Sequence, residues 1–272
     1  MIKIFHELPL DMLKEAYDIT DGDYCLPHLI DKYPEYKEYF LKARDDRRFI
    51  ICDNGLFEGV THTESDLLSK VELIHPNIFI VPDVWNNSDL TLRNAKHWIN
   101  NYGDNLPYPT NLMVVLQGET YYNIKTLYQH CIDLGYTHFS FNHSSVAYQN
   151  IFPHKNKLVS QMMGRICVIS KLYEEGIIRD SHYIHLLGCS LPEEFIYYKD
   201  YNFIKSIDTS NPVIKGIKHE IYKFPSNLTK PHEKIEEFME MDLDNEIAGI
   251  IEYNIKMFRR YIYNSQSTVL NG

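Results

Sequence analysis

The apolar run Phe49 to Cys52 is the feature that most restricts the fold, because it stops abruptly at an acid, Asp53, and a glycine turn. Four consecutive apolar residues are typical of a strand that is buried on both faces, as in a parallel sheet. The run therefore places Asp53 at the carboxyl end of a strand. Asp-Asn-Gly is also typical of a two-residue hairpin turn, which is the competing interpretation of this stretch alone. The recurrence of the pattern along the chain favours the buried strand.

Strand-like runs alternate with helical patterns over most of the chain. We expect seven strands, at residues 2–5, 49–52, 77–83, 111–118, 137–142, 182–188 and 203–208, and a weaker eighth at 221–224. Helical patterns lie between them, at residues 34–44, 65–74, 88–102, 120–134 and 155–175. Such alternation indicates parallel strands joined by crossover helices, and eight units close a TIM-type (β/α)8 barrel. We expect a single α/β barrel domain over residues 1–272, with a helical C-terminal part, about 231–263, packed outside.

Composition and cysteine usage narrow the class of protein. A chain of 272 residues, 44% of them hydrophobic, is long enough for one large core. The five cysteines are irregularly spaced without a Cys-x-x-Cys pair, so we expect a reduced, cytoplasmic protein without a disulfide framework or zinc knuckle. The N-terminus lacks a signal peptide, and nowhere do about 18 apolar residues run together, which argues against export and against a membrane partner. A net charge of −10 argues against a general nucleic-acid coat but allows one local basic face.

Polar residues end most of the expected strands. They are Asp53, Asp83, Gln117, Asn142, Gly188 and Asp208. In a barrel all carboxyl ends of the strands meet at one rim, so we expect these residues to converge. Three carboxylates in one cavity suit a nucleophile, an acid/base and a group that recognises substrate, because neighbouring acids push their pKa values apart. Divalent-metal ligands and ordinary strand-end caps remain the alternatives at this point.

Five short motifs follow one another between about residues 47 and 216. They are Cys52-Asp-Asn-Gly-Leu-Phe57, Val81-Pro-Asp83, Val115-Leu-Gln-Gly118, His185-Leu-Leu-Gly188 with Pro192-Glu-Glu beyond it, and Ser206-Ile-Asp-Thr-Ser210. In this order, each at an expected strand end, they resemble the tRNA-guanine transglycosylase family. The likeness is greatest to short phage relatives that place 7-deazaguanines in DNA.

The resemblance implies a base exchange through a covalent glycosyl-enzyme. By the motif match, Asp208 is the nucleophile and Asp53 the general acid/base. The remaining matches imply substrate-binding residues: Asp83, Gln117 and Gly118 at the edge of the base, Phe57 and Leu187 on its two faces, and Gly188 beside Leu187. The family chemistry implies no organic cofactor and no catalytic metal. The implied partners are DNA and a 7-deazaguanine base, in the host cytoplasm if the chain is phage-encoded.

Two departures from the family pattern bear on the substrate. The family's Gly-Gly base contact is replaced by Phe141-Asn-His-Ser144, so Asn142 and His143 are the candidates for holding the base or its 7-substituent. The tRNA enzymes carry a zinc site built from three cysteines and a histidine after the nucleophile, whereas no cysteine follows Cys189 here. We therefore expect a barrel that lacks the zinc-binding subdomain and acts on DNA rather than tRNA.

Three other functions stay open on the sequence. They are a tRNA-directed exchanger, a metal-dependent barrel enzyme such as a phosphohydrolase or one acting on another modified base, and a non-enzymatic base-binding module. His182 and His185 are set aside as joint metal ligands, because residues three apart on a strand point to opposite faces. Backbone phosphates could be met by two groups of basic residues, Lys215, Lys218 and Lys223 or Lys155, Lys157 and Arg165.

Overall fold

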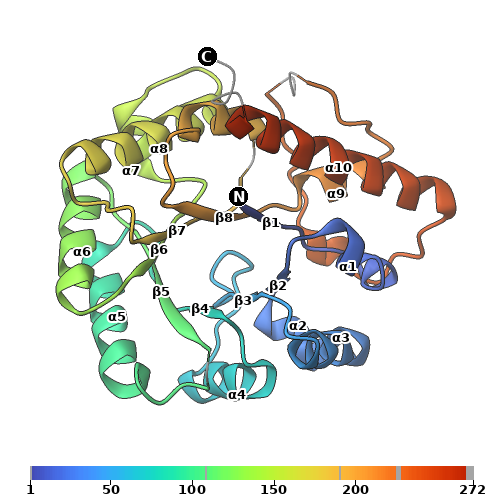
Figure 1. The fold of residues 1–272 in the computed structure, drawn as a ribbon, viewed down its shortest axis with the longest axis horizontal. Coiled ribbons are helices and arrows are strands. Elements are labelled where there is room, and N and C mark those ends of the chain that lie inside the picture. The colour runs from blue at the N-terminus through green and yellow to red at the C-terminus, as the bar shows by residue number, and fades with distance from the viewer. Residues whose placement is uncertain (1, 108, 190, 225–227, 268–272) are drawn as a thin grey trace.

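Eight short parallel strands form a barrel at the centre of the molecule (Figure 1). The structure is a computed structural model that describes residues 2–107, 109–189, 191–224 and 228–267. The strands are β1 (Lys3–Phe5), β2 (Asp23–Cys25), β3 (Ile50–Cys52), β4 (Ile78–Ile80), β5 (Asn111–Val115), β6 (His138–Phe141), β7 (Tyr183–Leu186) and β8 (Ile204–Asp208). They pair in parallel in the order β1-β8-β7-β6-β5-β4-β3-β2, so among the described strands only the ladder between β1 and β2 is missing. The predicted TIM-type (β/α)8 fold is therefore confirmed.

Helices surround the ring of strands (Figure 1). The α-helices are α1 (Ala16–Ile19), α2 (Pro27–Lys32), α3 (Pro34–Asp45), α4 (Glu64–Ile74), α5 (Ser88–Tyr102), α6 (Tyr121–Asp133), α7 (Val146–Ile151), α8 (Lys157–Glu174), α9 (Asn211–Ile217) and α10 (Asn245–Ser267). Short 3-10 helices are η1 (Leu10–Met12), η2 (Pro192–Tyr198) and η3 (Ile235–Phe238). None of the helices in the described ranges combines the length and apolar character that a bilayer crossing requires.

Side chains cap the helices that carry the sheet crossovers. The N-termini of α4 to α8 are capped by Thr63, Asn87, Thr120, Ser145 and Asn156, each accepting a backbone N–H. Such a cap contributes about 1 kcal/mol, because it satisfies a donor that the helix itself leaves unpaired. These caps fix where each helix starts after the loop that follows a strand.

The eighth strand was predicted at the wrong place. It is β2, residues 23–25, and the expected strand at 221–224 does not belong to the sheet. Its first residue, Asp23, is a buried acid that Arg48 neutralises at 2.6 Å, so no apolar run marks the strand. In the 221–224 segment, Tyr222 N donates to Asn254 Oδ1 at 2.7 Å, and its ring packs edge-on against Phe258. The apolar character there serves contact with α10, not strand pairing.

The C-terminal helix covers α9 on the outside of the barrel (Figure 1). Its fully buried apolar residues are Ile251, Ile255, Phe258 and Ile262, which recur at helical spacing and form one apolar stripe. Gly216 of α9 lies under this stripe, where a Cβ would come within 2.8 Å of the Ile251 Cα. The expected outer helix is thus present from residue 245. The segment 231–236, expected in the same outer layer, instead lines the cavity at the barrel mouth.

A side chain replaces the missing ladder between β1 and β2. Asp21 N donates to the Ile4 carbonyl at 3.1 Å, and Ile4 N donates to Asp21 Oδ2 at 3.0 Å. The Asp21 carboxylate is also paired with Arg259 and accepts the Tyr263 hydroxyl proton at 2.7 Å, both from α10. The first and second strands are therefore joined through a carboxylate that the C-terminal helix holds.

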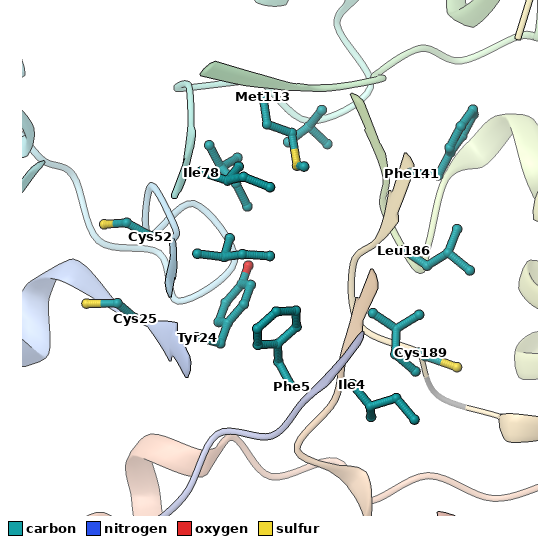
Figure 2. Close-up of a cluster of buried hydrophobic side chains, with 14 of the residues drawn as sticks. Ile4, Phe5, Tyr24, Cys25, Cys52, Ile78, Met113, Phe141, Leu186 and Cys189 are labelled. Carbon is teal, nitrogen blue, oxygen red and sulfur yellow. The ribbon is translucent and has the colours of Figure 1, made fainter. Parts of the chain in front are cut away.

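Side chains alternate between the interior and the exterior of the barrel along every strand. Figure 2 shows the rings of Phe5 and Tyr24 projecting into the barrel, whereas Cys25 and Cys52 point away from it. Phe5 is level with Asp208 across the β1–β8 pair, so Asp208 also faces inward. The same alternation, continued past Cys52, turns Asp53 inward. Strand register thus aims both acids at the same interior.

Candidate active site

A cavity of about 430 Å³ opens at the carboxyl ends of the strands. Nine of the ten predicted site residues line it: Asp53, Phe57, Asp83, Gln117, Asn142, His143, Leu187, Gly188 and Asp208. The tenth, Gly118, does not. Its carbonyl accepts the Ser145 hydroxyl proton at 3.0 Å, and a Cβ there would lie 2.8 Å from the Asn123 Cβ. Gly118 is therefore needed for close packing against the start of α6.

The Asp208 carboxylate has two hydrogen-bonding partners on β7 and in the loop that follows it. Its Oδ1 accepts the Gly188 backbone N–H at 3.0 Å and lies 3.0 Å from His185 Nε2. Gly188 has a φ of +61°, and a Cβ there would lie 2.8 Å from His143 Nδ1, so only glycine fits this loop. The side chain of Asp208 is nearly buried, with 5% of the residue exposed. The conformation of the loop after β7 therefore determines the orientation of the Asp208 carboxylate.

Asp53 lies in the same cavity with a pKa near neutrality. Burial raises the pKa of Asp53 to about 7, the hydrogen bond from the Asn54 N–H at 2.7 Å opposes this rise, and the charge of Asp208 adds to it. Asp53 N donates to the Cys25 carbonyl at 2.9 Å, which ties the start of the loop to β2. A carboxyl group with this pKa can both give and take a proton at physiological pH.

Asp83 is the centre of a buried amide network. Its Oδ1 accepts Asn54 Nδ2–H at 2.8 Å and its Oδ2 accepts Gln117 Nε2–H at 2.6 Å. Gln117 Oε1 in turn accepts the Asn86 backbone N–H at 3.0 Å and Asn142 Nδ2–H at 3.2 Å. Burial raises the pKa of Asp83 to about 6, against the effect of the hydrogen bonds from Asn54 and Gln117. The network fixes the orientation of both amides toward the carboxylate.

An exposed aromatic ring stands at the mouth of the cavity. Phe57 is 45% exposed, and its ring meets His143 edge-on with centroids 5.4 Å apart. Lys234 lies 5.0 Å from the centre of this ring and donates to the Phe57 carbonyl at 2.8 Å, and Lys230 lies 6.0 Å from the same ring. Burial holds the pKa of His143 well below its usual value, so the imidazole is neutral. The arrangement offers a partly exposed aromatic ring with two lysine ammonium groups over it.

Among the further acids that line the cavity, Glu7 and Glu58 were missed from the sequence. Withdrawal from water raises the pKa of Glu7 well above its ordinary value, with the charge of Asp208 adding to the rise. Burial also raises the pKa of Glu58 to about 8, and the charge of Asp53 adds to the rise. Both residues line the cavity together with Lys230, whose pKa burial lowers. Neither acid ends an apolar run, because Glu7 follows β1 by two residues and Glu58 lies in the turn beyond Asp53, so the pattern used above could not find them.

Arg165 does not serve as a surface cation. It is 2% exposed and forms a double hydrogen bond with Glu194, at 2.8 and 2.5 Å. Its Nη1 donates to the carbonyls of Phe141, Asn142 and Leu187 at 3.3, 3.2 and 3.0 Å. Arg165 therefore clamps the loops after β6 and β7, and the expectation that it meets phosphate is wrong.

Of the other basic residues expected to meet phosphate, two lie beside acids and one lines the cavity. Lys218 is paired with Glu233 at 2.5 Å, and Lys215 lies 3.6 Å from Glu220. Lys157 lines the cavity, as do Lys230 and Lys234, which sequence reasoning did not single out. In the part of the chain that the structure describes, no group of three or more His, Cys, Asp or Glu is arranged to hold a metal ion.

No protein-family model matches the chain, and no curated protein matches it.

Proposed function

We propose that the protein is a DNA base-exchange enzyme that replaces guanine with a 7-deazaguanine derivative, acting in the cytoplasm. The observation that carries the proposal is that Asp53 and Asp208 line one cavity, with the pKa of Asp53 raised to about 7. A nucleophilic carboxylate and a carboxyl group that can exchange protons at neutral pH are the two groups that glycosyl transfer with retention requires. The ordered motifs that resemble guanine transglycosylases support the choice of base.

The exchange proceeds in two balanced steps. The target nucleotide leaves the base stack and enters the cavity, at a cost of a few kcal/mol. Asp208 Oδ2 forms a bond to the sugar C1′ while the C1′–N9 bond breaks, its electron pair going to guanine and Asp53 giving guanine a proton. The incoming deazaguanine then loses a proton to Asp53 and attacks C1′, and the Asp208–C1′ bond returns its electron pair to the carboxylate.

The base would be held by its faces and by its polar edge. Phe57 offers an exposed aromatic face and Leu187 an aliphatic one in the same cavity. Each oxygen of Asp83 accepts one hydrogen bond from an amide, and a carboxylate oxygen can accept two. The N–H groups of a guanine edge therefore find acceptors without displacing Asn54 or Gln117.

The charges around the cavity support a substrate nucleotide that is part of a nucleic-acid strand. Lys157, Lys230 and Lys234 line the mouth, where phosphates on either side of a flipped nucleotide would pass. The interior is acidic and repels phosphate. No cysteine follows Cys189, so the zinc-bearing part of the tRNA enzymes is missing from this sequence, which favours DNA over tRNA.

Incorporation of labelled guanine tests the proposal. Purified protein is incubated with labelled guanine and with duplex DNA, single-stranded DNA or tRNA in separate reactions. Label should enter DNA, and Asp208→Asn should abolish incorporation and any denaturant-resistant protein–DNA adduct without abolishing guanine binding. Asp133→Asn, an exposed acid at the end of α6, is the matched control. Label in tRNA alone would refute DNA as the substrate, and an equally active Asp208→Asn protein would refute the mechanism.

Nucleoside mass analysis gives the same answer in cells. DNA from cells that express the protein and are supplied with deazaguanines should contain a deazaguanine nucleoside. Activity that is instead lost in chelator and leaves the base unexchanged would identify a metal-dependent enzyme.

A further inference from the structure

A chain of buried hydrogen bonds runs inside the barrel and ends at Asp208. His185 of β7 is fully buried, at 0% exposed, and is level with Ser206 of β8. Its Nδ1 lies 2.7 Å from Ser206 Oγ and its Nε2 lies 3.0 Å from Asp208 Oδ1. Tyr183 donates its hydroxyl proton to the same Ser206 Oγ at 2.9 Å. Ser206 and His185, the two inner members, thus each have one neighbour on either side.

The first donor in this chain fixes the direction of all the others. Burial raises the pKa of Tyr183 to about 12, so its phenol stays protonated and donates to Ser206. The single hydroxyl proton of Ser206 is then directed at His185 Nδ1, which must accept it. In a neutral imidazole the other nitrogen carries the proton, so Nε2–H points at Asp208 Oδ1. Ser206 and Tyr183 therefore select the tautomer that can donate to a carboxylate.

Aromatic packing prevents the imidazole from turning. The ring of Tyr24 from β2 stacks on His185 with centroids 6.1 Å apart and planes 14° apart. Phe5 from β1 meets the ring at a steeper angle, with centroids 6.3 Å apart. A ring held on its face and at its edge keeps both nitrogens in place. The donor to Asp208 is therefore rigid.

We propose that His185 is a positioning residue for the Asp208 carboxylate, an inference that rests on the proposed base exchange. In the described part of the chain, the Gly188 backbone N–H and His185 Nε2 both reach Oδ1 of Asp208, and no hydrogen bond reaches Oδ2. Oδ2 is therefore the oxygen presented to the sugar. When the Oδ2–C1′ bond forms, Oδ1 becomes the ester carbonyl oxygen. When the incoming base attacks C1′, charge returns to the carboxylate and the Nε2–H group stabilises it.

Two amide substitutions of His185 separate positioning from packing. Glutamine places its side-chain amide near the position of Nε2, and asparagine places it near the position of Nδ1. His185→Asn should therefore lower kcat about 100-fold with KM for DNA unchanged, because a misplaced reacting group costs about that factor. His185→Gln should recover about tenfold of the loss, because it restores a donor to Oδ1. Equal kcat in the two variants, or a loss confined to KM, would overturn the proposal.

His182 supplies the matched control. It is also buried and hydrogen-bonded, to Tyr128 at 2.8 Å, but it lies on the other side of the sheet, away from the cavity. His182→Gln should leave kcat unchanged at a temperature where it is folded. Unfolding curves for all three variants show whether each is compared in its folded state. A kcat loss in His182→Gln as large as that in His185→Asn would assign the effect to general packing and overturn the proposal.

Nitrogen NMR of the imidazole tests the positioning independently of activity. In the unsubstituted protein, His185 should show a protonated Nε2 and a bare Nδ1, and Ser206→Ala should weaken this preference. A protonated Nδ1, with or without a proton on Nε2, would overturn the proposal. If the tautomer is as expected but no nucleic acid accepts labelled base, the base exchange fails and the arrangement at Asp208 stands. If exchange occurs with the wrong tautomer, the positioning role alone fails.

Discussion

Asp53 should lower the stability of the folded protein at neutral and alkaline pH, and Asp53→Asn should remove this effect. Its pKa is raised from 3.8 to about 7, with burial as the largest cause. The folded protein then binds the proton more tightly than the unfolded chain does. Stability is therefore highest below pH 3.8 as far as this group is concerned, and it falls as the pH rises toward 7. The difference between the two pKa values corresponds to about 4 kcal/mol, at about 1.4 kcal/mol per unit.

Asparagine keeps the shape of the neutral acid and can still accept the Asn54 N–H through its Oδ1. Asp53→Asn should therefore be more stable than the unsubstituted protein at pH 8 by up to about 4 kcal/mol, and nearly equal to it at pH 4. Denaturant unfolding at several pH values measures the difference directly. The same variant should lose base exchange. If the stability difference between Asp53→Asn and the unsubstituted protein does not grow between pH 4 and pH 8, the pKa of Asp53 is not raised by burial. A near-neutral acid/base at this position would then be refuted as well.

Three other substitutions separate the remaining parts of the site. Phe57→Ala should weaken base binding by about 1–3 kcal/mol in a titration and lower stability little, because the ring is half-exposed; unchanged affinity would exclude stacking. Arg165→Met should destabilise the protein by about 3–5 kcal/mol in urea unfolding, because it leaves the Glu194 charge buried without its partner, and Arg165→Met with Glu194→Leu should recover part of that loss; a stable single variant would contradict the clamp. Lys230→Gln should reduce the slope of log Kd for DNA against log salt by about one; an unchanged slope would exclude a phosphate contact.

The sequence was most informative where a strand is buried among other apolar groups. The runs that end at Asp53 and Asp208 stand out because their side chains need no partner to be buried. β2 escaped detection because Asp23 is buried only with the help of Arg48, which lies 25 residues along the chain. A sequence pattern that compares only neighbouring residues cannot detect a neutralising partner 25 residues away.

The same limit applies inside the site. His185 was set aside because it is poorly placed to share a metal with His182, and that geometric argument is sound, since the two point to opposite sides of the sheet. Its actual partners, Ser206 and Asp208, become neighbours only through the register of β7 and β8, which includes an irregularity at Ile184 and His185. Gly118, which was expected to contact the base, does not line the cavity. A glycine beside a base-contact motif is indistinguishable in sequence from one that lets a helix approach.

The link between β1 and β2 has a mechanical consequence for the two acids. Asp208 ends β8, the strand next to β1, and Asp53 follows β3, the strand next to β2, so the gap between the proposed nucleophile and the proposed proton donor spans this junction. Backbone ladders join the strands along the rest of the circumference, whereas here the ends are joined by one backbone hydrogen bond, from Asp21 N to the Ile4 carbonyl, and by the Asp21 carboxylate, which Arg259 and Tyr263 hold. The C-terminal helix α10 thereby supports the junction at which the barrel closes, next to the strands that carry the two proposed reactive acids.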